Sequence, residues 1–183
     1  VNSLGVDAVA AFNAVSIADS YILAPGDSLA ASMTTFAAQN KGAGTGERIE
    51  KGLKTMLCMA EIYVCLAAVI VFTKSRWILG IFLKPQETAA LAFGLSYLLP
   101  MSLGYVLTGI TNTFQGYFRG IGNLKITLWA TLLQIPIRVA VTYLLLAVLG
   151  LQAVAVGTAI GWICMAVFQY FCYRKWGIHK TVA

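Results

Sequence analysis

Hydrophobic residues fill five long stretches of the chain, and short polar segments between them hold most of the charges. A helix that spans a membrane needs about 20 predominantly apolar residues. The stretches that we predict to be such helices are residues 6–39, 53–73, 89–118, 126–149 and 152–172. Three of them contain a proline, which is tolerated in a membrane helix because neighbouring helices can satisfy the freed backbone groups. The pattern therefore predicts an all-α integral membrane protein.

The composition supports this fold class. Hydrophobic residues make up 59% of the 183 residues and charged residues only 11%, with a mean hydropathy of +0.79. A soluble domain is about 25% charged, so a soluble protein is excluded. We expect residues 1–183 to form one transmembrane domain that ends in a basic tail, residues 173–183. Because the chain starts at Val1 and holds an odd number of predicted spans, we expect further sequence to precede it.

The net charge of +6 would suggest a nucleic-acid partner on a soluble protein. Here all basic residues except Arg138 lie outside the apolar stretches or at their very ends, so we predict a membrane-lipid partner and no nucleic acid. Nine Lys and Arg residues fall on one predicted side of the membrane and three on the other. Cytoplasmic loops are the ones enriched in Lys and Arg. The count predicts a multi-pass protein of the cell membrane with a cytoplasmic C-terminus.

Motifs of soluble chemistry are missing from the sequence. The cysteines lie inside apolar stretches at spacings that match no metal or redox motif, and no phosphate-binding glycine loop or nucleophile motif occurs. We therefore predict that the protein is not an enzyme and has no metal site.

A polar stripe runs along the first stretch. At 100° per residue its members fall within an arc of about 60°. They are Asn13, Ser16, Ser20, Asp27 and Thr34. Asp19 points away from this stripe. In one interpretation the stripe lines a cavity and Asp27 binds a cation or a proton; in the other, Asp27 is an interior carboxylate neutralised by an arginine.

The third stretch has a polar face of its own. Its members are Tyr105, Thr108, Asn112 and Gln115. These side chains would either bind a substrate in the same pathway or hold helices together through interhelical hydrogen bonds.

Arg138 is a charge in the middle of the fourth stretch. An arginine at the bilayer centre costs about 2.5–3.5 kcal/mol on insertion scales. Asp27 and Glu61 are predicted to lie at a similar depth. We therefore predict a structural ion pair of Arg138 with Asp27 or Glu61, and a direct transport role for Arg138 is the alternative.

Several motifs resemble those of one transporter family. They are Phe36-Ala37-Ala38-Gln39-Asn40-Lys41-Gly42-Ala43-Gly44, then Gln115-Gly116-Tyr117-Phe118-Arg119-Gly120-Ile121-Gly122-Asn123-Leu124-Lys125, and Gln134-Ile135-Pro136-Ile137-Arg138. In this order the chain resembles the second half of multidrug and toxic-compound extrusion (MATE) transporters. In contrast to sodium-coupled members, which have an acidic residue in the tenth helix, the matching region here holds Thr108.

The resemblance implies twelve helices in two lobes, of which this chain supplies a five-helix part of the second lobe. The N-terminal lobe of the same polypeptide would be its partner. The implied function is secondary active antiport by alternating access: a sodium ion or proton enters while a small organic, often cationic, compound leaves. No cofactor is implied beyond this coupling ion.

Two other functions are considered. One is a flippase for lipid-linked precursors with a related fold, which would need a basic groove, and only Arg138 is suited to one within the membrane. The other is a membrane subunit without transport activity.

Overall fold

The computed structural model describes residues 5–177, and these form five helices with no strand among them. The helices are α1 (Val6–Gly42), α2 (Gly46–Phe82), α3 (Thr88–Gly120), α4 (Leu124–Leu149) and α5 (Gln152–Trp176). Each is long and apolar enough to cross a membrane. The prediction of an all-α fold with five membrane-spanning helices is confirmed.

The helix α2 is longer than the predicted span 53–73 at both ends. Its 37 residues measure about 55 Å at 1.5 Å per residue, whereas the hydrocarbon core of a bilayer is about 30 Å thick. The apolar stretch marks only the part of the helix that contacts lipid. The helix continues beyond that part because the polar residues that follow also favour helical structure. Likewise α5 extends to Trp176, into the predicted tail, whose residues 178–183 lie outside the described residues.

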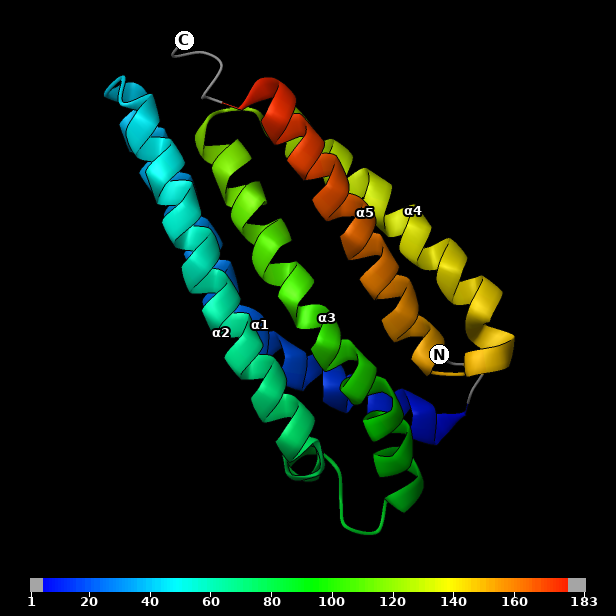
Figure 1. Ribbon diagram of the computed structural model, residues 1–183. Coiled ribbons are helices and arrows are strands. Elements are labelled where there is room, and N and C mark those ends of the chain that lie inside the picture. Colours follow the sequence, from blue (N-terminus) through cyan, green and yellow to red (C-terminus); the bar gives the residue numbers. More distant parts are fainter. Residues whose placement is uncertain (1–4, 178–183) are drawn as a thin grey trace.

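The helix α3 is at the centre of the bundle (Figure 1). It packs against α1 and α2 on one side and against α5 on the other, while α4 packs mainly against α5. The turns α1–α2 and α3–α4 lie at the same end of the bundle as the last residues of α5, and we call this the Gly44 end. The turns α2–α3 and α4–α5 lie at the opposite end, called the Gly150 end after the positive-φ glycine between α4 and α5.

Glycines allow α3 to approach α1 closely near the Gly44 end. A Cβ atom at Gly116 would overlap the carbonyl oxygen of Ala30 and lie 3.1 Å from the Cβ of Met33. A Cβ atom at Gly120 would likewise overlap the Thr34 carbonyl oxygen of α1. Small residues of this kind let membrane helices pack backbone against backbone.

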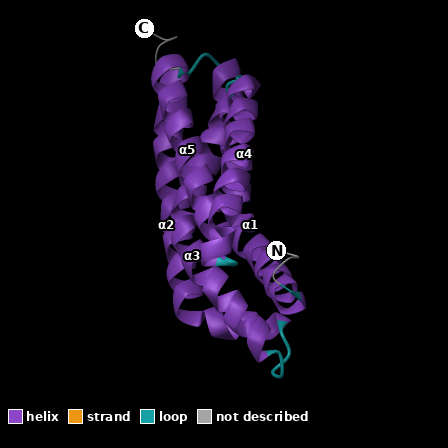
Figure 2. Ribbon diagram, turned by 90° about the vertical axis from the view of Figure 1, so that its right-hand side faces the viewer, coloured by secondary structure: helices purple, strands orange, loops and turns teal. Residues whose placement is uncertain are grey.

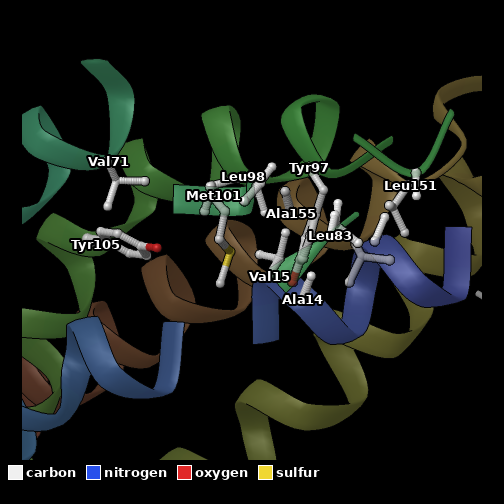
Figure 3. Close-up of a cluster of buried hydrophobic side chains, with 14 of the residues drawn as sticks. Ala14, Val15, Val71, Leu83, Tyr97, Leu98, Met101, Tyr105, Leu151 and Ala155 are labelled. Carbon is white, nitrogen blue, oxygen red and sulfur yellow. The ribbon is translucent and has the colours of Figure 1, made fainter. Parts of the chain in front are cut away.

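The buried core toward the Gly150 end is formed by side chains of α1, α2, α3 and α5 (Figure 3). It includes Val15, Val71, Leu98, Met101 and Tyr105.

The helix α1 changes direction along its length, so that its N-terminal part is inclined to the rest of the bundle (Figures 1 and 2). Pro25 lies within α1 and has no N–H to donate to the carbonyl of Tyr21. At this level the hydroxyl of Tyr63, on α2, donates a hydrogen bond of 2.5 Å to the carbonyl oxygen of Ile22. A neighbouring helix thus supports the backbone of α1 beside its proline.

Candidate functional site

The two predicted polar faces meet at one hydrogen bond between α1 and α3. The side-chain amide of Asn112 donates to Asp27 Oδ1 at 2.8 Å. Asp27 is exposed and Asn112 is half-buried, so the carboxylate keeps one side free of the described helices. A carboxylate held in this way presents a negative charge within the span of two helices and can attract a cation.

The other members of the α1 stripe lie on a surface that no described helix covers completely. Asn13 and Ser20 are exposed, and Ser16 and Thr34 are half-buried. The hydroxyls of Ser20 and Thr34 donate to backbone carbonyls of α1 itself, four residues earlier. They therefore tie no second helix to α1.

The polar face predicted on α3 is divided between the surface and the interior. Asn112 and Gln115 are half-buried, but Tyr105 and Thr108 are buried. The Thr108 hydroxyl donates to the Tyr105 carbonyl at 2.7 Å. In this structure Tyr105 and Thr108 therefore do not line an open pathway surface, because helices surround α3 on more sides than its polar pattern indicated.

Asp19, a carboxylate that lies outside the predicted polar stripe of α1, has a specific hydrogen-bond partner. The hydroxyl of Tyr105 donates to Asp19 Oδ1, and Asp19 is half-buried between α1 and α3. Tyr97, a second buried tyrosine of α3 shown in Figure 3, belongs to the same buried core as Tyr105. The spacing in the sequence could have identified Asp19 as an interior residue. It lies four residues after the buried Val15, on the face of α1 that packs against its neighbours.

The predicted ion pair is wrong for this structure. Within the described part of the chain, Arg138 lies within 4 Å of neither the Asp27 nor the Glu61 carboxylate. The reason is the side-by-side order of the helices: α4 packs on α5, on the far side of α3 from α1 and α2. Two residues at a similar depth in the membrane can thus lie on helices that are not neighbours.

Glu61 has a different environment from the one predicted. Its buried Oε1 has no hydrogen-bond partner among residues 5–177 and would be overlapped by a Cβ atom at Gly109. The carboxylate of Glu61 thus packs against the backbone of α3 from α2.

Within residues 5–177 no group of three or more His, Cys, Asp or Glu side chains is arranged to hold a metal ion. The chemistry that this site offers is that of two separate carboxylates on α1, each paired with a polar side chain of α3.

Comparisons with known proteins agree on one family. The MatE family model matches residues 1–144. The chain is 28% identical over 183 residues to the probable multidrug resistance protein YpnP of Bacillus subtilis, covering 98% of this chain and 41% of that protein. It is 30% identical over 135 residues to the probable multidrug resistance protein YoeA of the same organism, covering 74% of this chain and 28% of that protein.

A solved structure described as "Crystal structure of MATE in the bent conformation" has the same fold, with a TM-score of 0.86 at 18% identity. The match covers 100% of this chain and 40% of that one. The chain thus spans about two fifths of the length of the first relative and of the solved structure that it matches. With five membrane-spanning helices and a family model that matches more than half of its residues, this multi-pass membrane chain belongs to the MatE family.

Proposed function

We propose that the chain is part of an antiporter that exports organic, often cationic, compounds in exchange for sodium ions or protons by alternating access. It would supply the eighth to twelfth helices, in the second of two lobes, and the rest of the polypeptide would supply the other lobe. Membership of the MatE family supports compound efflux as the general activity. The observation that supports a site in this chain is the exposed Asp27 carboxylate held by Asn112.

The polar surface of α1 and α3 is suited to a cationic organic compound. Asp27 provides a negative charge, Asn112 provides a hydrogen-bonding amide beside it, and the half-buried Gln115 lies three residues farther along α3. Tyr21, on the same helix, is 76% exposed and offers an aromatic ring to a flat molecule. A cation beside an aromatic ring gains about 0.5–2 kcal/mol, depending on how far it is desolvated. We propose that this surface lines the second-lobe side of the substrate cavity.

Alternating access requires that substrate and ion bind the outward-open and inward-open forms with different affinities. A charge on or near α1 satisfies this requirement if the opposite lobe approaches Asp27 in one form and withdraws in the other.

The experiment is reconstitution of the intact native polypeptide in lipid vesicles. Efflux of a fluorescent organic cation is measured under an imposed sodium gradient and, separately, under a proton gradient. Efflux driven by one of them is expected and identifies the coupling ion. Absence of efflux with both gradients would overturn antiport and leave the flippase or a non-transporting subunit.

Asp27→Asn tests the site within this experiment. Removal of the charge should lower efflux of the organic cation without preventing insertion of the protein. Full efflux with unchanged ion dependence would remove Asp27 from the pathway.

A further inference from the structure

The two α1 carboxylates that bond side chains of α3, Asp27 and Asp19, differ in what can reach them. Asp27 is exposed, with an amide on one side. Asp19 is half-buried against α3 and is bonded by a phenol whose own side chain is buried. A bulky organic cation can therefore approach the first carboxylate more freely than the second, which is partly covered by α3.

The groups around Asp19 leave its negative charge without a direct ion pair in the described part of the chain. From α3, Tyr105 donates a hydrogen bond to it. From α2, the titratable side chains at this level have other contacts: Tyr63 bonds the Ile22 carbonyl, and Glu61 packs on Gly109.

We propose that Asp19, together with Tyr105, is the binding site for the coupling cation, a proton or a sodium ion, and that Asp27 receives the organic substrate. This rests on the antiport function proposed above. A carboxylate removed from water without a paired cation is costly, so a small cation that neutralises it binds favourably. A phenol oxygen both donates and accepts, so Tyr105 can bond the free carboxylate and can also accept from a protonated Asp19 or ligate sodium.

The test uses the intact polypeptide in vesicles and two assays. One measures efflux of a fluorescent organic cation driven by the gradient of the coupling ion. The other measures exchange of the same compound across the membrane at equal ion concentrations, which requires no net ion movement. Asp19→Asn should lower gradient-driven efflux by about tenfold or more and leave exchange in place, within the usual range of coupling between two ligands. Asp27→Asn should lower both, and Asp7→Asn, an exposed carboxylate in the first turn of α1, should change neither.

Gradient-driven efflux by Asp19→Asn at the wild-type rate would overturn the assignment, and so would equal loss of efflux and exchange. Tyr105→Phe supplies a milder variant, in which the concentration of the ion that gives half-maximal efflux should rise several-fold. An unchanged value in Tyr105→Phe would also count against the site.

A binding measurement separates this inference from the proposed function. Purified intact protein is titrated with radioactive sodium, and proton release is recorded on addition of the organic cation. Asp19→Asn should lose the bound sodium or the released proton, while Asp27→Asn keeps the sodium. Wild-type protein that binds the ion at Asp19 but shows no efflux would contradict antiport alone, whereas unchanged ion binding in Asp19→Asn would contradict the site alone.

Discussion

Gly116 lets the backbones of α1 and α3 approach closely, since a Cβ atom there would overlap the Ala30 carbonyl oxygen. Gly116→Ala should therefore force the two helices apart and lower the free energy of unfolding by about 1–3 kcal/mol, as overpacking does. Thermal unfolding of the purified protein in detergent measures this effect. Gly80→Ala is the matched control, because a Cβ atom at Gly80 of α2 meets nothing within 4 Å. Equal effects of the two substitutions would show that close approach at Gly116 is not what stabilises the pair.

Glu61 gives a second test at this scale, since its buried Oε1 has no hydrogen-bond partner in the described part of the chain. Glu61→Gln removes the charge and keeps the shape of the side chain. We expect it to leave the melting temperature unchanged or to raise it, because a partly buried carboxylate without a paired cation is unfavourable. A clear fall in the melting temperature on Glu61→Gln would show that the ionised carboxylate has a stabilising partner.

Arg138 and Asp19 show how far single residues were predictable. The sequence predicted an ion-pair partner for an arginine within a membrane helix, and the candidates Asp27 and Glu61 were chosen by depth alone. The choice failed because α3 lies between these helices and α4. Asp19 was missed because the sequence pattern compares a carboxylate only with the other polar residues of its own helix. Its partner Tyr105 belongs to a different helix, α3.

At the scale of elements, the five helices were predicted from apolar stretches, but α2 extends well beyond its predicted span at both ends. The α2 ends illustrate the reason: the first turns carry Glu47 and Lys51, which form an ion pair of 2.7 Å at i, i+4. Such polar residues favour helical structure but lower the mean hydropathy, so a span predicted from hydropathy leaves them out.

The support of the α1 backbone by Tyr63 can be tested at the same scale. Tyr63→Phe removes the hydrogen bond to the Ile22 carbonyl and should destabilise the protein by about 0.6 kcal/mol, the average of interhelical bonds in membranes. It should also speed amide hydrogen exchange in α1 around Pro25. The control is Tyr143→Phe, at a side chain of α4 that is 75% exposed. Faster exchange near Pro25 in the control than in Tyr63→Phe would contradict the supporting role.

At the scale of the whole molecule, the arrangement of the ends carries a prediction about orientation. The Gly44 end gathers Lys41, Arg48, Lys51, Arg119 and Lys125, and the Gly150 end has far fewer basic residues. We propose that the Gly44 end is cytoplasmic, following the enrichment of Lys and Arg in cytoplasmic loops.

Single-cysteine labelling checks this orientation in cells. With the four native cysteines replaced, Gln86→Cys in the α2–α3 turn should react with a membrane-impermeant maleimide added outside, and Lys125→Cys should react only after permeabilisation. Reaction of Lys125→Cys in intact cells would reverse the proposed orientation.

The contacts near the Gly44 end have a mechanical consequence. There Gly116 and Gly120 hold α3 against α1, Lys41 Nζ donates to the Ile121 carbonyl at 2.5 Å, and the hydroxyls of Tyr117 and Tyr173 bond Glu50. Four helices are thereby fixed to one another at this end, whereas the proline of α1 lies farther along the helix. The 19 residues of α1 before Pro25 form an arm of about 28 Å, so a change of about 10° at the proline moves its tip by about 5 Å. Motion within this part of the protein should therefore grow toward the Gly150 end. The distance between two spin labels should vary at the Gly150 end and stay constant for a pair near Gly44.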